Sequence, residues 1–351
     1  MRICFVLPRT ESKAIGGYKV VFDYANHLAA LGEEVCILFL NTRYLKAYHV
    51  PRGMKRAYFD IITSREPRWF PLDSRVQKVS DYSHEVGSVL QSTDIAVATA
   101  VSTASYVTSH FETSRKVYFI QGYETWGTPE ERVHETYRLG MTNIVISHWL
   151  KDIVERESGV PAVLINNPID TSTYCVTKPI DQRPHYSLAV LYNPNPVKGF
   201  SNALRVLLML KKRYPDLQVN AFGAYKRPRQ LPDWVSYKQN ATQLETVDIY
   251  NSASVFLCSS LDEGYGLTGL ESMACGCALS TTDYAAVHEY AVDGVNCLTS
   301  PVGDAEAQYI NVCKLFDDSE LRTSLATNAV DSVGEFAWDV AIRKLYDAVG
   351  I

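Results

Sequence analysis

The residues best suited to chemistry in this sequence lie in one glycine-rich stretch, residues 261–271. The stretch carries Glu263 and Glu271 with three glycines between them, and it runs from an apolar segment into an amphipathic one. Glycine lets a backbone approach a ligand closely, and the amide groups at the start of a helix attract an anion. The stretch therefore predicts a turn from a strand into a helix that binds a phosphate-bearing ligand through its backbone.

The same glycines match the G-x-G-x-x-G fingerprint of a dinucleotide site, which begins here at Gly264 and has Asp283 at a suitable distance. Two observations disfavour a nicotinamide or flavin site. Asp262 and Glu263 stand directly before the first glycine, where two carboxylates would crowd a pyrophosphate. The fingerprint also normally follows the first strand of its unit, whereas this loop follows the third strand of a second series.

Two other glycine turns stand at predicted helix starts. Gly16 and Gly17 precede a helix in the first half of the chain, and Lys198 with Gly199 begins a helix in the second half. Such a turn can close over phosphate groups, although glycine pairs are also common in ordinary turns.

The elements that must position these residues form two series of short apolar runs that alternate with amphipathic segments. Strands of the first series are expected near residues 2–8, 35–40, 95–98, 117–120, 144–146 and 163–165, and those of the second near 188–192, 218–222, 254–258 and 278–280. A polar stretch, 167–186, lies between the series. The pattern predicts two doubly wound α/β domains with parallel sheets, over residues 1–170 and 185–334.

Several helix ends and faces are also predicted. One helix face in the first domain carries Val20, Val21, Tyr24, Leu28 and Leu31. Thr128 as N-cap and Pro129 at the first helical position open another helix, and Thr242 with Glu245 forms a capping box. A last helix, about 337–349, lies beyond what the second sheet needs.

The composition is that of an ordinary soluble protein, with 351 residues, 46% hydrophobic and 21% charged residues, and a net charge of −5. The lack of a basic excess argues against nucleic acid as a partner. No apolar run reaches the roughly 18–20 residues of a membrane span, and the apolar run in the first residues is too short for a signal peptide. The eight cysteines fit free, buried thiols, so we expect a cytoplasmic location.

The run EGYGLTGLESMACGCALSTTDYAAVHEYAVDGVNCLTSPVGD, residues 263–304, resembles the signature of the family-4 retaining glycosyltransferases (glycosyl transferases group 1) almost position for position. Residues 116–126 and 138–150 resemble a branch often found among surface-polysaccharide gene products. The resemblance implies the GT-B fold, in which two Rossmann-like domains face each other across a cleft. It also implies that the first domain binds the acceptor, that the second binds the nucleotide-sugar donor, and that the final segment, 335–351, crosses back to the first domain.

The resemblance also implies roles for single residues. Glu263 would bind the donor sugar near its reacting face, and Lys198 would neutralise charge on the leaving diphosphate. The donor-binding residues implied are Gly16, Gly17, Asn193, Gly266, Leu267, Thr268 and Glu271. Glu271 would hold the ribose hydroxyls, although an acid in the first turn of a helix is also favoured by the helix dipole. In the family, the leaving phosphate itself deprotonates the acceptor hydroxyl, so no separate protein base is expected.

The sequence departs from the family pattern at two positions. Asn193 stands where the family has an arginine, five residues before Lys198, so one cation is missing. Thr99 stands where many relatives have a histidine. The loop after a buried strand, where an α/β sheet presents ligand groups, carries Gln121, Tyr123, Glu124 and Trp126. We expect Tyr123, Glu124 and Thr99 to bind acceptor or sugar. An ordinary loop salt bridge is the alternative for Glu124.

Residues 43–78 are the one charge anomaly, with nine Lys or Arg against three acids. Aromatic residues are interleaved with them, namely Tyr44, Tyr48, Tyr58, Phe59, Trp69 and Phe70. This mixture suits an anionic membrane surface or a phosphorylated acceptor, and a solvated basic face is the alternative.

The sequence as a whole thus predicts a GT-B glycosyltransferase of the hexosyltransferase type. Its expected partners are a UDP-, GDP- or dTDP-sugar and a glycan, lipid-linked or small-molecule acceptor, with no cofactor. No D-x-D pair occurs, so no metal is expected at the diphosphate. A location at the inner face of the membrane would suit residues 43–78. The alternatives are a GT-B epimerase or phosphorylase, and a non-catalytic interaction partner.

Overall fold

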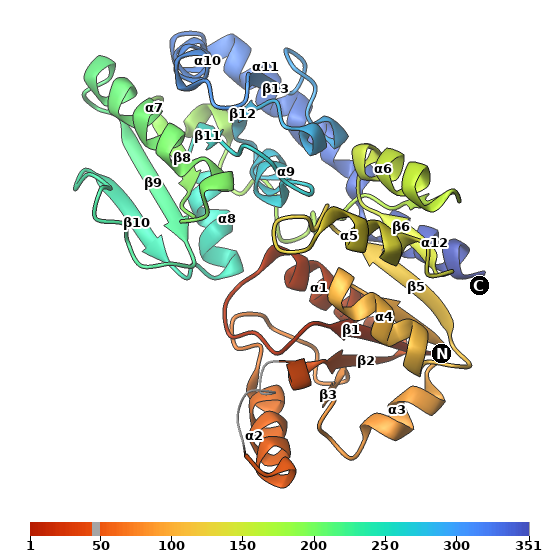
Figure 1. Ribbon diagram of the computed structural model, residues 1–351. Helices are drawn as coiled ribbons and strands as arrows, with labels where there is room; N and C mark the ends of the chain where they lie inside the picture. The colour runs from red at the N-terminus through yellow and green to blue at the C-terminus, as the bar shows by residue number, and fades with distance from the viewer. Residues whose placement is uncertain (44–49, 351) are drawn as a thin grey trace. The chain divides into compact units, whose positions relative to one another are not determined.

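The computed structural model describes residues 1–43 and 50–350 and contains two compact units. The first unit comprises Met1–Asn166 together with Ala341–Ile351, and the second comprises Asn167–Val340. In each unit, helices cover a parallel sheet (Figure 1).

The first unit has a seven-stranded sheet in the order β3-β2-β1-β4-β5-β6-β7. Its strands are β1 (Arg2–Leu7), β2 (Glu34–Phe39), β3 (Gln77–Ser80), β4 (Ile95–Ala98), β5 (Arg115–Ile120), β6 (Thr142–Val145) and β7 (Val163–Leu164). Its helical segments are α1 (Gly16–Ala30), η1 (Asn41–Arg43), α2 (Arg52–Arg65), α3 (Val86–Ser92), α4 (Val101–His110), α5 (Glu130–Tyr137) and α6 (His148–Ser158). The chain moves outward from β1 to β3 and then returns to β4 on the other side of β1, so the strand order reverses between β1 and β4.

The second unit has a six-stranded sheet in the order β10-β9-β8-β11-β12-β13. Its strands are β8 (Ser187–Leu191), β9 (Gln218–Gly223), β10 (Val235–Gln239), β11 (Val255–Cys258), β12 (Ala278–Thr282) and β13 (Cys297–Ser300). Its helical segments are η2 (Ile180–Gln182), η3 (Pro196–Lys198), α7 (Phe200–Arg213), α8 (Gln243–Asn251), α9 (Leu267–Ala274), η4 (Ala285–Glu289), α10 (Ala305–Asp317), α11 (Ser319–Ser332) and η5 (Val333–Phe336). Here the order reverses between β8 and β11. Two doubly wound parallel sheets confirm the predicted fold class.

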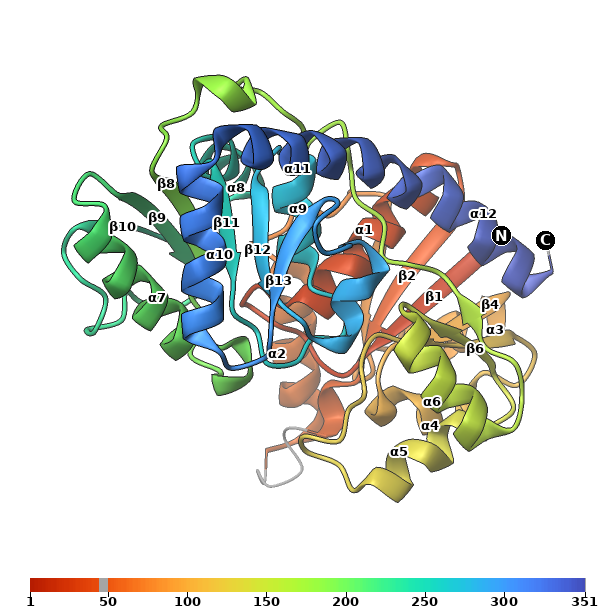
Figure 2. The same ribbon diagram turned by 90° about the horizontal axis from the view of Figure 1, so that it is seen from above.

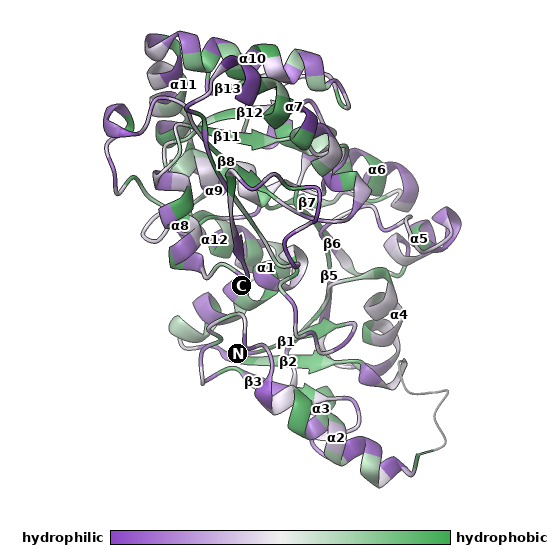
Figure 3. Ribbon diagram, turned by 90° about the vertical axis from the view of Figure 1, so that its left-hand side faces the viewer, coloured by the Kyte–Doolittle hydropathy of each residue, from purple (hydrophilic) through white to green (hydrophobic). Residues whose placement is uncertain are grey.

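The central strands are apolar because both faces of each sheet are covered. In the second unit, Leu188 and Val190 of β8 pack with Leu257 of β11 and with Val206 of α7 and Val312 of α10. Figure 3 shows the hydrophobic colouring of these strands against the mixed colouring of the helices. Continuous apolar runs of this kind are typical of parallel sheets and explain why the central strands could be recognised in the sequence.

Three strands were not predicted, and all three lie at the edge of a sheet. They are β3 in the first unit and β10 and β13 in the second. An edge strand is covered less completely, so its sequence contains polar residues and no long apolar run, as in the QKVS of β3 and the VSYKQ of β10. Periodicity alone could not separate them from loops.

The helix predictions have different outcomes. Thr242 and Glu245 form the predicted capping box at the start of α8. The predicted N-cap Thr128 is wrong, because α5 begins at Glu130 with Pro129 in the cap position and without a side-chain cap. Leu31 is also wrong as a buried position, since it follows the last turn of α1 and is 61% exposed.

The last helix, α12 (Trp338–Val349), brings the end of the chain to the first unit, as Figure 2 shows. The Tyr346 hydroxyl donates to Glu33 at 3.1 Å, and the other oxygen of Glu33 accepts from the amino terminus of Met1 at 2.6 Å. Arg115 of β5 donates to the carbonyl of Gly350 at 3.1 Å. Both ends of the chain are therefore tied to the same side of the first sheet.

The segment before the second sheet is anchored by a buried arginine. Arg183 donates to the carbonyl oxygens of Ala253 and Gly276, both at 3.0 Å, and of Cys275 at 2.6 Å. Because the guanidinium is buried without an acidic partner among these contacts, its pKa is lowered. These bonds attach the polar stretch that separates the two strand series to the second unit.

All eight cysteines are free thiols, and all except Cys175 are buried. No helix in the described part of the chain is both long and apolar enough to cross a membrane.

Candidate functional site

The reversal of strand order in the second sheet decides which loops meet. β8 and β11 are neighbours although α7, β9, β10 and α8 lie between them in the chain. Both strands run in the same direction, so the loops that follow them leave at the same edge of the sheet. The first loop carries Asn193 and Lys198, and the second carries Glu263. In open α/β sheets this is where ligands bind.

Lys198 and Glu263 form an ion pair at this edge. Their Nζ and Oε2 atoms are 2.5 Å apart, and the Ser260 hydroxyl donates to the other carboxylate oxygen of Glu263 at 2.8 Å. Both side chains are only partly exposed. The structure thus brings together the two residues predicted to be catalytic, and it adds Ser260 as a second partner of Glu263.

Gly199 allows the two loops to approach each other. It has φ +62°, and a Cβ atom on it would lie 1.7 Å from the carbonyl oxygen of Ser259. A backbone bond from Leu261 to the carbonyl of Val197, 2.7 Å, joins the loops further. Only glycine fits this backbone geometry and this space.

The start of α9 lies directly after the loop of Glu263. Gly266 caps the helix with φ +89°, and Leu267 and Thr268 are its first residues. Amide groups in the first turn of a helix have no partner within the helix and can bind an anion. The structure therefore positions the three residues predicted to face a diphosphate as the beginning of one helix.

Two tyrosines that the sequence analysis did not predict as site residues contact this turn through hydrogen bonds. The Tyr290 hydroxyl donates to the carbonyl of Gly266 at 2.9 Å, and the hydroxyls of Tyr284 and Tyr290 are 2.7 Å apart. A Cβ atom on Gly266 would lie 2.0 Å from the Tyr284 hydroxyl. Both phenols are fully buried, which raises their pKa and keeps them protonated as donors. The only signal in the sequence was a pair of aromatic residues after a strand.

Glu271 lies on α9 and is 6% exposed. The Tyr250 hydroxyl donates to its Oε2 atom at 3.3 Å. Burial, with the charge of Glu271 nearby, raises the pKa of Tyr250, so this phenol remains a donor. A carboxylate held in this way on the helix after the glycine turn can accept hydrogen bonds from vicinal hydroxyls.

Asn193 has a local structural role in its loop. Its Oδ1 atom accepts a hydrogen bond from the amide of Asn195 at 2.9 Å, which closes a turn, and the side chain of Asn195 in turn caps η3 through Val197. Lys198 follows at the end of η3. Asn193 therefore shapes the loop that carries Lys198, in addition to standing where the family has an arginine.

The first unit has the same kind of edge, after β1 and β4. Gly16 and Gly17 are the first residues of α1, which follows the loop after β1. A Cβ atom on Gly17 would be 3.5 Å from the side-chain amide of Gln121, which follows β5. The glycine pair and the loop after β5 are thus in contact.

Glu124 lies beside the start of α4. Its Oε2 atom accepts a hydrogen bond from the amide of Val101, the first residue of α4, at 3.2 Å. The side chain is partly buried, and desolvation raises its pKa to about 7. The alternative of a loop salt bridge is not seen among the described contacts of Glu124, whose carboxyl group has a pKa near neutral pH.

Thr99 and Tyr123 are both engaged within the first unit. The Thr99 hydroxyl donates to the carbonyl of Val6 at 2.7 Å, and the Thr99 amide donates to the Thr103 hydroxyl at 2.9 Å. The Tyr123 hydroxyl donates to Glu130 and lies 2.7 Å from Nε2 of His134. These two residues hold the loops in place around Glu124.

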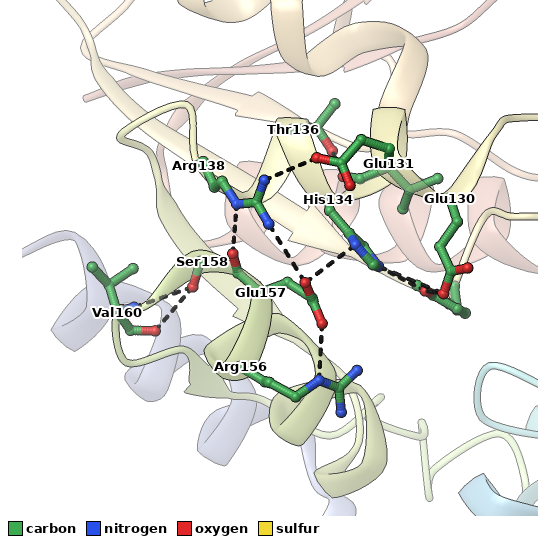
Figure 4. Close-up of polar contacts among 11 residues, drawn as sticks. Glu130, Glu131, His134, Thr136, Arg138, Arg156, Glu157, Ser158 and Val160 are labelled. Carbon is green, nitrogen blue, oxygen red and sulfur yellow. Dashed lines mark hydrogen bonds and ion pairs between the residues drawn. The ribbon is translucent and has the colours of Figure 1, made fainter.

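His134 belongs to a polar cluster between α5 and α6 (Figure 4). Its Nδ1 atom is 3.2 Å from Glu157, and Arg138 and Arg156 also contact Glu157, at 3.5 and 2.9 Å. These cations hold the pKa of Glu157 below its usual value. The cluster fixes α5 against α6 and, through His134, the loop of Tyr123.

Trp126 lies on the loop where the sequence predicted ligand groups, and it is 80% exposed. The edge of its ring is 3.5 Å from where a Cβ atom of Gly122 would be, so the glycine leaves room for the indole. An exposed aromatic side chain beside Glu124 is a surface on which a sugar ring can stack. No group of three or more His, Cys, Asp or Glu side chains in the described ranges is arranged to hold a metal ion.

Several solved structures share this fold over the whole chain. TarM of S. aureus, solved with fondaparinux, α-GlcNAc-glycerol and UDP, has a TM-score of 0.77 at 9% identity, and 100% of each chain is covered. HepE of Anabaena, solved with UDP-glucose, has a TM-score of 0.76 at 13% identity, again with 100% of each chain covered. The two doubly wound parallel sheets and the likeness to these structures define the GT-B fold.

Curated relatives agree with this class. The chain is 27% identical over 269 residues to the O-antigen biosynthesis protein RfbC of Myxococcus xanthus, which covers 74% of this chain and 21% of that protein. It is also 26% identical over 204 residues to the phosphatidyl-myo-inositol mannosyltransferase of Mycolicibacterium smegmatis, and the matched region covers 54% of this chain and 53% of that enzyme. The chain thus spans about a fifth of the first relative and about half of the second.

The model of the family glycosyl transferases group 1 matches residues 188–331, which include β8, β11 and α9 with Lys198, Glu263 and Glu271. The chain is similar to this family over these residues.

Proposed function

We propose that this protein is a retaining glycosyltransferase of the hexosyltransferase type. It moves a sugar from a nucleotide-diphosphate sugar to a hydroxyl group of a glycan, lipid-linked or small-molecule acceptor. The observation that carries the proposal is the pairing of Lys198 with Glu263 at the switch point of the second sheet, directly before the helix that begins at Gly266. The match to the group 1 family supports it, as do relatives named for O-antigen biosynthesis and mannosyl transfer.

In the proposed reaction the donor diphosphate binds the first turn of α9 and the ammonium of Lys198. Glu271 accepts hydrogen bonds from the ribose hydroxyls, and Glu263 exchanges part of its contact with Lys198 for hydroxyls of the donor sugar. The bond between the anomeric carbon and the diphosphate oxygen breaks, and a bond from that carbon to the acceptor oxygen forms on the same face. The acceptor proton passes to an oxygen of the leaving diphosphate. Charge neutralisation by Lys198 and the helix then requires no metal.

We assign acceptor binding to the first unit. Glu124 beside the start of α4 and the exposed Trp126 on the same loop support this assignment. A carboxyl group can accept hydrogen bonds from saccharide hydroxyls, and an aromatic face can stack on a sugar ring. We also propose that the enzyme works in the cytoplasm at the inner face of a membrane, which the basic segment after β2 supports.

The proposal is tested first by thermal unfolding with UDP, GDP, dTDP or ADP in the presence of a chelator. A diphosphate at about a hundredfold its dissociation constant adds about 2.7 kcal/mol, which moves the melting temperature by a few degrees. One nucleotide is expected to stabilise the protein, and the shift should shrink in Glu271→Gln but not in the exposed control Glu306→Gln. No shift with any diphosphate would overturn the donor assignment.

Turnover is tested next with the sugar conjugates of the nucleotide that binds. Glu263→Gln should keep the shift with the nucleotide diphosphate, which lacks the sugar that Glu263 contacts, and should lose about a hundredfold or more in transfer rate. NMR of the product should show the anomeric configuration of the donor. Inversion of that configuration would contradict the retaining mechanism.

A non-catalytic role is the second candidate, and Asn193 favours it. Its amide closes a turn and brings no positive charge to the loop, where the family has an arginine. If the protein binds a nucleotide diphosphate but Glu263→Gln leaves its biological activity unchanged, this second function is the right one. Turnover of the sugar nucleotide without any acceptor would instead indicate an epimerase.

A further inference from the structure

Helix α2 presents apolar side chains on the side that faces away from its own unit. Met54, Tyr58 and Ile61 are 64%, 54% and 51% exposed. They stand at positions i, i+4 and i+7, so they form one continuous stripe along the helix, which we call the α2 stripe. Single exposed apolar residues are normal on a protein surface, but three in one stripe require an explanation.

The opposite side of α2 already supplies the packing that the fold needs. Phe59 is 7% exposed and stacks on Tyr82 with ring centroids 5.1 Å apart. Thr63 is 2% exposed, and its hydroxyl lies 3.1 Å from that of Thr10. Arg56 donates to the carbonyl of Tyr82 at 2.9 Å. The helix therefore has a complete inner face, and the stripe is an addition to it.

Positive charge accompanies the stripe. α2 contains four cations, at positions 52, 55, 56 and 65, and one acid, Asp60, which gives a net charge of +3 (4 − 1). Arg52 and Arg65 are exposed, and Arg65 follows Ile61 by four residues, so it extends the stripe with a cation. Figure 3 shows hydrophobic and hydrophilic residues interleaved along α2.

The aromatic residues expected from the sequence to contact a membrane are mostly in other places. Phe59 and Phe70 are buried, and Phe70 packs against Phe22 of α1. Tyr44 and Tyr48 lie outside the described residues. Of the predicted aromatic residues that the structure describes, Tyr58 is exposed, and the other exposed side chains of the α2 stripe are those of Met54 and Ile61.

We propose that the α2 stripe and its arginines form a docking surface for an anionic lipid bilayer. The proposal rests on the membrane location given above and is independent of the transfer chemistry. Met54, Tyr58 and Ile61 insert at the level of the acyl-chain boundary, and Arg52 and Arg65 reach the phosphate groups beside them with their long side chains. The net positive charge of the helix makes the partner anionic.

The test is flotation of the full chain with vesicles of phosphatidylcholine, alone or mixed with phosphatidylglycerol. Binding is expected to the mixed vesicles only and to weaken as salt increases. The variant M54Q/Y58Q/I61Q should bind about tenfold or more weakly, as should R52E/R65E. Glutamine keeps a high helix propensity, so α2 should remain folded.

The matched control is L208Q/L244Q/I310Q, which changes three residues on helices of the second unit that are 43%, 71% and 51% exposed. It should bind vesicles like the unchanged protein. All variants should retain the thermal shift with the nucleotide diphosphate, so loss of lipid binding is separated from failure of the donor site.

Four results would overturn the proposal. The first two are flotation with neither kind of vesicle and equal flotation with both. The third is binding of the α2 variants to the mixed vesicles at the level of the control. The fourth is a dimer of the unchanged protein in solution that M54Q/Y58Q/I61Q converts to a monomer, which would show that the α2 stripe contacts a second copy of this chain.

Discussion

Lys198 and Glu263 neutralise each other's charge in an ion pair. At 2.5 Å, and with Ser260 on the second oxygen, Glu263 has no free carboxylate oxygen among these contacts. A donor must therefore exchange these contacts for its own, which keeps the cost of holding two partly buried charges low in both states. The residues that support the site from outside this pair are open to separate tests.

Tyr290→Phe should weaken nucleotide binding without touching the ligand. The change removes the bond to the carbonyl of Gly266 and the partner of the Tyr284 hydroxyl. We expect a loss of about 1 kcal/mol in stability and a dissociation constant for the diphosphate about fivefold higher. Thermal unfolding and calorimetric titration measure both. Tyr346→Phe is the control, since the Tyr346 hydroxyl bonds to Glu33 in the first unit. The prediction would be contradicted if Tyr290→Phe and Tyr346→Phe both bound the nucleotide with the affinity of the unchanged protein.

Glu124 should make stability depend on pH. Its pKa is raised from 4.5 to about 7 by burial, so between these values the folded protein holds a proton that the unfolded chain has lost. The contribution of Glu124 to stability therefore falls as pH rises through this window and is constant above it. Glu124→Gln removes this pH dependence. The free energy of unfolding of the variant relative to that of the unchanged protein should therefore be about 1–2 kcal/mol higher at about pH 8 than at about pH 4. Urea unfolding at both pH values measures the difference, and a difference independent of pH would show that Glu124 is not desolvated.

At the scale of elements, the site depends on two loops that are brought together by strand order. β8 and β11 are adjacent, and the loops after them meet where Gly199 passes the carbonyl of Ser259. The helix starts at Gly199 and Gly266 then have fixed directions. The contact between backbones leaves no space for a side chain, so element packing and site geometry depend on the same residue.

Gly199→Ala should destabilise the second unit by about 2–4 kcal/mol. The new Cβ atom would combine a positive φ with a backbone contact at 1.7 Å, which no flexible side chain can relieve. Gly303→Ala is the matched control, with φ +82° and no atom within 4 Å of the new Cβ atom, and should cost about 1 kcal/mol. Urea unfolding measures the loss in free energy of unfolding of each variant. Equal losses would mean that the loops move apart at little cost.

At the scale of the whole molecule, the chain enters and leaves through the first unit. The second unit is inserted between residue 166 and residue 341, and α12 completes the first unit from the far end of the sequence. The buried residues of α12 are Ala341, Ile342, Leu345 and Val349. The stability of the first unit thus depends on residues that lie far from its strands in the sequence.

Leu345→Ala should loosen the first unit although it lies more than three hundred residues from β1. Truncation of a buried leucine costs about 2–4 kcal/mol, and hydrogen exchange should speed up at amides of β1 and β2. The exposed neighbour change Lys344→Ala should cost less than about 0.5 kcal/mol. Faster exchange confined to the second unit would contradict this division of the chain.

Much of the fold was accessible from the sequence because central strands are continuous apolar runs. The edge strands β3, β10 and β13 were missed because partial cover removes that signal. The loops that carry Lys198 and Glu263 could be recognised one at a time, from glycines at helix starts. Their contact could not, because the order of strands in a sheet is not written in any local pattern.

The sequence by itself determined the class of this protein, with alternating strands and helices in two series and a glycine-rich turn between two glutamates. These are local features, which follow from the types and spacing of neighbouring residues. Only the tertiary structure decided that Lys198 pairs with Glu263, that Tyr290 holds Gly266, and that the exposed face of α2 is apolar. Each of these depends on contacts between segments distant in sequence, because burial and partnership are properties of the packed chain.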